Sequence, residues 1–203
     1  MLLASFLIVA FSYRGLASGN SNQRVETRMV HAGCEPELND FNVVPPISLS
    51  TSMTQPFPGI RPGIDNPNSH GQGFYYSRAA NPTRGALERA LASVEAAKHG
   101  TVYSSGLAAT QAVIQLLASG DHVLALDDLY GGTSTQFRNI IMPGSNIQFS
   151  FVNLDNLKAV EAALRPETKM IWMESPTVYP IPTIYTVIHT IHTILYTLYR
   201  IHC

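Results

Sequence analysis

Charged residues and cysteines are scarce in this chain of 203 residues. Only 13% of the residues are charged and the formal net charge is -1, so the chain has no basic stripe to neutralise nucleic-acid phosphates. Its two cysteines, Cys34 and Cys203, lie near opposite ends, which favours free thiols in a reducing compartment. These shortages argue against a nucleic-acid partner, a disulfide framework and a cysteine-based metal site.

The amino terminus lacks an apolar run long enough to cross a membrane as a helix. Residues 2–11 are apolar and the small residues "LASG" follow, as in a secretory signal over residues 1–19, but no Lys or Arg precedes the run. We favour a non-homologous leader or a misassigned start over residues 1–24, with a secretory signal as the alternative. No membrane partner is expected.

Residues 25–80 are rich in Pro, Gly, Asn and Ser, as in "VVPPISLSTSMTQPFPGIRPGIDNPNSHGQGFYYSR". Such a composition interrupts helices and strand ladders, so it predicts an extended arm. The arm ends in three aromatic residues and an arginine, which indicate a binding role: Phe74, Tyr75, Tyr76 and Arg78.

A regular pattern begins at Asn81, a favourable helix N-cap, followed by proline at the first helical position. The pattern predicts a helix that ends at Gly100 and buries a face made of Leu87, Leu91 and Val94.

Strands and helices then alternate. The segments "TVYSS", "HVLALDD", "IQFSFVN" and "TKMIWMES" are typical of strands. The segments between them, "GLAATQAVIQLLASG", "GGTSTQFRNIIM" and "DNLKAVEAAL", are typical of helices, the last with Asp155 as its expected cap. This alternation predicts an α/β domain with a mostly parallel sheet.

Ligands of such sheets bind beyond the carboxyl ends of the strands, and three of these ends are chemically suggestive. Gly106 and Leu107 open a helix after Ser105, an arrangement that binds phosphate or is simply a tight turn. Tyr130 precedes two glycines and is suited either to stacking on a planar ligand or to covering the core. Glu174 ends an apolar strand, where its carboxylate needs a polar ligand or an ion-pair partner.

Several long motifs resemble the Cys/Met-metabolism family of pyridoxal-phosphate-dependent enzymes, the trans-sulfuration enzymes. They are "TRMVHAGCEPE", "VVPPISLSTSMTQ", "YYSRAANPTRGALERALASVEAAKHG", "SSGLAATQAVI", "GDHVLALDDLYGGT" and "PETKMIWMESPT". The resemblance covers about residues 25–177. It implies an incomplete large domain of a type I, aspartate-aminotransferase-like pyridoxal-phosphate enzyme over residues 81–177, preceded by the arm.

The resemblance also implies roles for the residues at the strand ends. Gly106 and Leu107 are expected to donate to the phosphate of pyridoxal 5'-phosphate, with Ser105 in the same turn. Tyr130 is expected to stack on the pyridine ring, and Glu174 to lie beside the cofactor.

On the arm, the resemblance implies that Tyr76 and Arg78 reach across a dimer interface to the phosphate of the neighbouring subunit, since an arginine fork suits a phosphate. The resemblance further implies a parent enzyme that is a cytoplasmic homo-oligomer, a dimer of dimers, and that cleaves or forms carbon–sulfur bonds in sulfur amino acids.

The chain departs from the family pattern at Val178, where members have asparagine. In the family, the Schiff-base lysine and the aspartate that holds the ring nitrogen lie beyond this point. The three lysines of this chain, Lys98, Lys158 and Lys169, are in none of the settings that the family uses. We therefore expect an amino-terminal fragment without catalytic residues, inactive alone, and as an alternative a non-catalytic subunit that docks through its arm.

Residues 178–203 form a low-complexity tail: between Thr183 and His202, 16 of 20 residues are Thr, Ile, Tyr or His. A repeated TACA tetranucleotide encodes these four residues, and every valine codon begins with GT, as introns do. We interpret the tail as a retained intron or a gene-model error. The spacing of His189, His192 and His202 arises without selection in such a tract, so no metal is expected.

Overall fold

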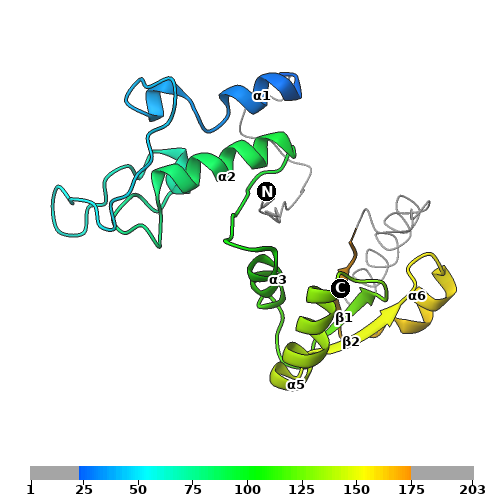
Figure 1. The fold of residues 1–203 in the computed structure, drawn as a ribbon. Coiled ribbons are helices and arrows are strands. Elements are labelled where there is room, and N and C mark those ends of the chain that lie inside the picture. The colour runs from blue at the N-terminus through cyan, green and yellow to red at the C-terminus, as the bar shows by residue number, and fades with distance from the viewer. Residues whose placement is uncertain (1–22, 175–203) are drawn as a thin grey trace, which may run out of the picture. The chain divides into compact units, whose positions relative to one another are not determined.

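The computed structural model describes residues 23–174. The chain divides into two compact units, Met1–Ala109 and Thr110–Cys203 (Figure 1).

The first unit is built around one long helix. It contains α1 (Val25–His31), the short helical turns η1 (Pro36–Leu38) and η2 (Pro67–Ser69), and α2 (Pro82–Val94). The arm between them is mostly irregular, as its proline and glycine content predicts, and both α1 and η2 pack against α2 (Figure 1). The predicted cap is confirmed, because Asn81 Oδ1 accepts hydrogen bonds from the backbone N–H groups of Thr83 and Arg84 at 2.9 and 3.1 Å.

The predicted end and buried face of α2 are wrong. The helix stops at Val94, and Ala96 adopts a left-handed conformation with φ of 52°. Leu87 is 43% exposed, and the buried residues of α2 are Gly85, Ala86, Glu88 and Ala92. The small face is buried because η2 approaches the helix backbone closely: a Cβ atom added at Gly85 would lie 1.7 Å from the carbonyl oxygen of Asn68.

This close approach predicts that Gly85→Ala destabilises the first unit. Alanine normally stabilises a helix interior by about 1 kcal/mol relative to glycine. Here the added Cβ would force η2 away from α2, so urea denaturation should show a lower midpoint. Gly144→Ala is the matched control, since no atom lies within 4 Å of its added Cβ, and it should not lower the midpoint. Equal effects of the two changes would contradict the close approach.

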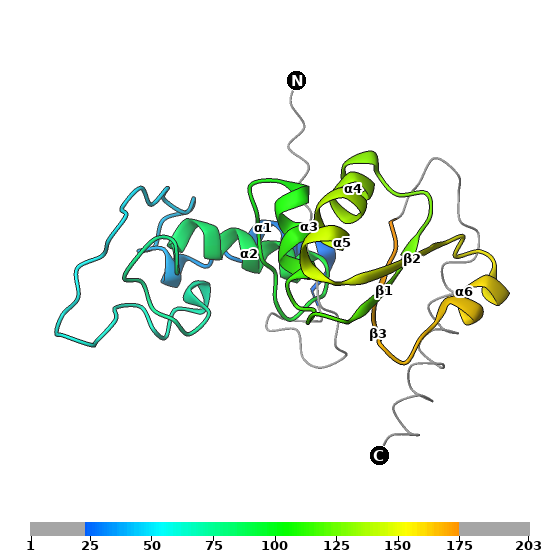
Figure 2. The same ribbon diagram turned by 90° about the horizontal axis from the view of Figure 1, so that it is seen from below.

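The second unit contains a three-stranded parallel sheet. After α3 (Gly106–Ile114), which begins in the first unit, come β1 (His122–Leu126), α4 (Gly131–Thr135), the π-helical segment η3 (Gln136–Ile141), α5 (Met142–Ser145), β2 (Gln148–Val152), α6 (Leu157–Ala163) and β3 (Thr168–Trp172). The strand order is β2-β1-β3, and Figure 2 shows the strands side by side. His122 of β1 pairs with Gln148 of β2 and with Thr168 of β3. The predicted α/β class and parallel sheet are confirmed.

Two further local predictions, one in each unit, are wrong. Residues 101–105, expected as a strand, form none. The backbone N–H of Val102 donates to the Glu88 carboxylate at 3.2 Å, so this donor is used by a side chain and not by a strand ladder. The cap of α6 is Asn156, whose side chain accepts from the N–H of Ala159, and not Asp155.

The central strand β1 is buried on both faces, as its continuous apolar sequence predicts. One face belongs to a cluster with α3 and η3, which contains Ile114, Val123, Ala125, Phe137, Ile141, Ile147 and Phe149. The other face packs on α6 and contains Leu124, Leu126, Leu154 and Val160. Successive β1 side chains therefore face opposite layers, and helices cover both faces of the sheet.

Candidate functional site

Polar groups follow β1 and β3 at the carboxyl edge of the sheet. Glu174, two residues after β3, accepts a hydrogen bond from the backbone N–H of Tyr130 at 2.7 Å. The other oxygen of this carboxylate accepts from the indole N–H of Trp172 at 3.2 Å. Two N–H donors of its own unit thus satisfy the half-buried carboxylate. The sequence suggested a polar ligand or an ion-pair partner for Glu174. These two hydrogen bonds account for the position of the carboxylate without either partner.

The side chain of Tyr130 is 69% exposed and does not cover the core. Tyr130 is the residue before α4, and its ring lies over Gly132, where an added Cβ would be 2.6 Å from a ring carbon. Gly132 therefore gives the ring room, and the exposed surface of the ring is available for stacking on a planar group.

Replacing Glu174 by alanine should release the Tyr130 loop, because two hydrogen bonds to a charged acceptor are lost at about 1.5–3 kcal/mol each. Trp172 is the single tryptophan of the chain, so its fluorescence reports this change directly. We expect its emission to shift to longer wavelength as the indole N–H turns to water. Glu167→Ala, which removes an exposed carboxylate before β3, is the control; an unchanged spectrum in Glu174→Ala would contradict the contact.

The start of α3 is capped by Ser105. Its hydroxyl oxygen accepts from the backbone N–H of Ala108 at 3.2 Å, which leaves the hydroxyl hydrogen free to donate outward from an exposed position. Gly106 and Leu107 are the first two residues of the helix, where the helix dipole is positive. The sequence-predicted turn is therefore present, although it does not follow a strand.

On the arm, Tyr76 and Arg78 lie together. The guanidinium carbon of Arg78 is 4.9 Å from the centroid of the Tyr76 ring. Arg78 is exposed, and Tyr76 is anchored by an antiparallel bridge to Ser52. The residue that fixes this segment is Arg84, which sequence reasoning missed. Its guanidinium donates to the carbonyl oxygens of residues 77, 78 and 79 at 2.9, 3.4 and 3.0 Å.

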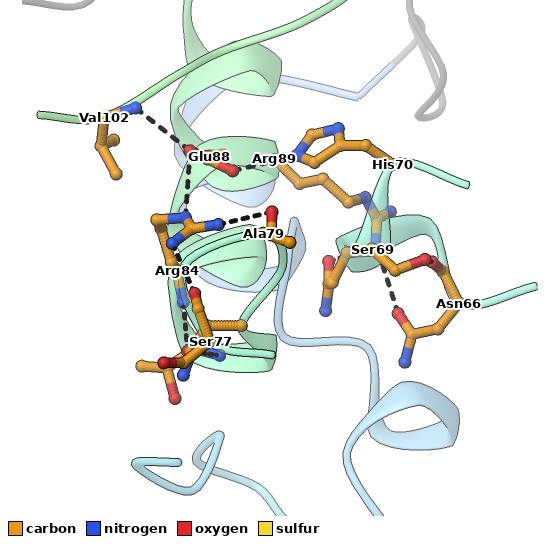
Figure 3. A network of polar contacts seen from close by, with 12 residues as sticks. Asn66, Ser69, His70, Ser77, Ala79, Arg84, Glu88, Arg89 and Val102 are labelled. Atoms are coloured by element: carbon orange, nitrogen blue, oxygen red, sulfur yellow. Dashed lines mark hydrogen bonds and ion pairs between the residues drawn. The ribbon is translucent and has the colours of Figure 1, made fainter. Parts of the chain in front are cut away.

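The structure thus brings the predicted residues together in local groups. The first unit contains the Tyr76–Arg78 pair and the Ser105–Gly106–Leu107 turn, and the second unit contains the Tyr130–Glu174 pair. Sequence reasoning also missed Glu88, which contacts Arg84 and Val102 (Figure 3). The four-residue spacing of Arg84 and Glu88 on one helix was the available signal.

A second polar cluster lies at the opposite, amino edge of the sheet. His122 is fully buried, with Nδ1 2.8 Å from Thr168 Oγ1 of β3 and Nε2 3.0 Å from Ser150 Oγ of β2. Arg165 donates to both hydroxyl oxygens, through its backbone N–H and its guanidinium. Burial, and secondarily the Arg165 charge, lower the pKa of His122 below its usual 6.5, with Glu167 acting in the opposite direction.

Within residues 23–174 no group of three or more His, Cys, Asp or Glu residues could hold a metal ion, and Cys34 is a free thiol. Across the same range, no helix combines the length and apolar character needed to cross a membrane. The three tail histidines lie outside the described residues.

A parallel sheet with helices on both faces defines an α/β domain of the doubly wound class, in which ligands generally bind beyond the carboxyl ends of the strands. The chain belongs to the family described as Cys/Met metabolism PLP-dependent enzyme, which matches residues 26–198.

The chain is similar to named members of this family. It is 42% identical to the cystathionine gamma-lyase of Mus musculus over 158 residues, covering 77% of this chain and 37% of that protein. It is 38% identical to the cystathionine beta-lyase of Coxiella burnetii over 161 residues, covering 79% of this chain and 39% of that protein. The crystal structure of cystathionine gamma-lyase from Lactobacillus plantarum complexed with L-serine matches with a TM-score of 0.67 and 32% identity, over 76% of this chain and 38% of that one.

The chain therefore spans less than two fifths of the length of these relatives. The family match extends beyond Val178 into the residues that we interpret as a tail, whereas the two pairwise matches each cover less than four fifths of the chain. The division into leader, arm, α/β domain and tail remains a prediction.

Proposed function

We propose that this chain is the arm and cofactor-binding portion of a cytoplasmic pyridoxal-phosphate-dependent carbon–sulfur lyase of transsulfuration, of the cystathionine γ-lyase type. The observation that carries the proposal is the 42% identity to the mouse cystathionine gamma-lyase across 77% of this chain. Cystathionine β-lyase is the first alternative, given the 38% identity to the Coxiella protein. Cystathionine γ-synthase and methionine γ-lyase, which belong to the same family, are the others.

The residues present fit the phosphate and ring of pyridoxal phosphate. The Ser105 hydroxyl has a hydrogen to donate at the positive end of α3, a suitable place for a phosphate. The exposed Tyr130 ring would stack on the pyridine ring, on a loop that Glu174 holds in place. When bound, the cofactor supplies the electron sink for breaking the carbon–sulfur bond of a sulfur amino acid. The role of this chain is to bind and orient the cofactor.

The three lysines of the chain are all exposed on the surfaces of their units. A nucleophilic lysine is activated by desolvation in an apolar pocket, which an exposed position does not provide. We propose that Lys98, Lys158 and Lys169 do not join the cofactor covalently, and that this chain alone has no lyase activity.

Titration with pyridoxal phosphate tests this proposal. We expect saturable binding that inorganic phosphate competes away, without the absorption band of a cofactor joined to a specific lysine. Ser105→Ala should weaken binding about tenfold, the worth of a hydrogen bond to a charged group. Asn156→Ala is the control, because it also removes a helix cap, that of α6, and should leave the affinity for pyridoxal phosphate unchanged. Absence of saturable binding, or equal affinities of the two variants, would contradict the proposal.

The exposed apolar side chains of the arm favour a second role, that of a non-catalytic subunit. Eight large apolar residues are exposed between residues 41 and 64: Phe41, Val43, Val44, Ile47, Leu49, Phe57, Ile60 and Ile64. Such a surface is costly unless a partner covers it. In this role the arm docks on an intact subunit of the homo-oligomer, where Tyr76 and Arg78 reach the phosphate of the neighbour.

Co-expression with a tagged intact homologue tests this second role. We expect the two chains to purify together, and we expect Val43→Asp to prevent it by placing a charge in the apolar interface. Asp65→Asn, which changes an exposed polar residue of the arm, is the control. Failure of the unsubstituted chain to co-purify would exclude this role and leave the binding titration unaffected.

A further inference from the structure

Glu88 is a nearly buried carboxylate in the first unit, with its side chain 6% exposed. A buried charge is costly unless partners compensate it. Glu88 has three partners: the backbone N–H of Val102 and Nε of Arg84 lie 3.2 and 3.7 Å from Oε1, and Nε2 of His70 lies 3.0 Å from Oε2. They come from three different parts of the chain and converge on this carboxylate (Figure 3).

The partner Arg84 connects Glu88 to the arm. Its guanidinium donates to three successive carbonyl oxygens, those of Ser77, Arg78 and Ala79. This is the turn that presents Tyr76 and Arg78. The Arg84–Glu88 pair is the less favourable orientation for helix stability, since glutamate is better placed on the amino-terminal side. Its stronger effect is therefore to orient the guanidinium toward the turn.

The partner Val102 connects Glu88 to the start of α3. The preceding Gly100 passes so close to α2 that an added Cβ would lie 2.7 Å from the Glu88 carbonyl oxygen. Backbone and side chain of Glu88 thus both lie against residues 100–102, three residues before the capping Ser105. Glu88 of α2 therefore fixes the direction in which the chain enters the Ser105 turn.

We propose that Glu88 is a positioning residue that couples the two phosphate-facing elements of this unit: the turn of residues 76–79, which would serve the neighbouring subunit, and the turn of residues 105–107, which would serve its own. The identity of the ligand rests on the proposed function; the coupling of the two elements does not. A disturbance at one element therefore reaches the other through one carboxylate, and two sites of an oligomer communicate through it.

Hydrogen exchange of the full chain without ligand tests the coupling. Ala79 and Ala80 report on the arm turn, since their N–H groups donate to the carbonyl oxygen of Tyr76, and Val102 reports on the approach to α3. In Glu88→Ala we expect exchange to accelerate about tenfold or more at both places, because Val102 loses a hydrogen bond to a charged group and the arm turn loses the ion pair that orients Arg84.

Two further variants separate the two branches and keep the test valid if Glu88→Ala does not fold. Glu88→Gln retains the acceptor oxygen, so Val102 should recover its protection while Ala79 and Ala80 do not. Arg84→Lys loses the guanidinium fork, so only Ala79 and Ala80 should lose protection. Reversal of either pattern would overturn the proposal.

The matched control is Glu35→Ala. It removes an arm carboxylate that accepts two hydrogen bonds from Arg89, which lies next to Glu88 on α2. This pair contacts neither turn, so after correction for global stability both reporters should keep their protection. If Glu35→Ala and Glu88→Ala accelerate exchange equally at both places, Glu88 only stabilises the unit and the proposal fails. Failure of the pyridoxal phosphate titration would instead count against the proposed function alone.

Discussion

Phe137→Ala is expected to lower the free energy of unfolding of the second unit by about 3–5 kcal/mol. Phe137 is fully buried in η3, and its ring centroid lies 4.8 Å from that of Phe149 and 5.3 Å from that of Trp172. Truncation therefore removes the aromatic contacts that join η3 to the two outer strands and leaves a cavity beside β1. Since domains have about 5–15 kcal/mol of stability in total, the variant should be largely unfolded at moderate temperature.

Urea titration followed by Trp172 fluorescence measures this loss, because the tryptophan ring is itself one of the contacts. Leu116→Ala, at an exposed position, is the control and should change stability by no more than about 0.5 kcal/mol. Similar midpoints for the two variants would show that η3 does not pack on the sheet in solution. The change should also loosen Tyr130, which precedes α4 in the same helical run.

His122 is expected to make the stability of the sheet dependent on pH. Its folded-state pKa is lowered, so it stays neutral in the folded chain at pH values where the unfolded chain already binds a proton. Its contribution is therefore fully present above about pH 6.5, the unfolded value, and is lost as the pH falls toward the folded pKa. Between these two pKa values, the slope of the free energy of unfolding against pH approaches about 1.4 kcal/mol per pH unit for one proton.

The measurement compares urea denaturation of the unsubstituted chain and of His122→Leu between pH 8 and pH 5. Leucine fills a similar volume without titrating, and Ser150 and Thr168 keep their hydrogen bonds from Arg165. We expect the stability difference between the two chains to shift in favour of the leucine variant as the pH falls. His99→Asn, at an exposed position, should titrate like the unsubstituted chain. Parallel curves for His122→Leu would contradict a buried neutral imidazole.

The predictions that held depend on local signals. Asn81 and Pro82 predicted the start of α2 because a cap acts on neighbouring N–H groups. The run at residues 122–126 predicted a buried parallel strand because both faces of it are apolar. Both signals are contained in a few adjacent residues, so no distant partner had to be known.

The predictions that failed depend on distant partners. The leucine face of α2 was expected to be buried, but α1 and η2 of the arm pack on the small residues of α2. The irregular arm has no hydrophobic periodicity from which this packing could be predicted. Glu88 and His122 were missed because their hydrogen-bond partners Val102 and Thr168 lie 14 and 46 residues away, and the four-residue spacing of Arg84 and Glu88 was the one local signal. The expectation that functional residues follow the carboxyl ends of strands singled out both Tyr130 and Glu174. It did not predict that the Glu174 carboxylate accepts a hydrogen bond from the backbone N–H of Tyr130.

The position of β1 in the sheet has a consequence for synthesis on the ribosome. Of the three strands that the structure describes, β1 is made first, yet it lies between β2 and β3, which pair with it across 26 and 46 residues, from His122 to Gln148 and to Thr168. At about 5–20 residues per second, the strand waits roughly 2–9 seconds for its second neighbour. During that interval the unpaired edge of a mostly apolar strand is open to other nascent chains, so slower translation or a lower chaperone supply should reduce the yield of this protein.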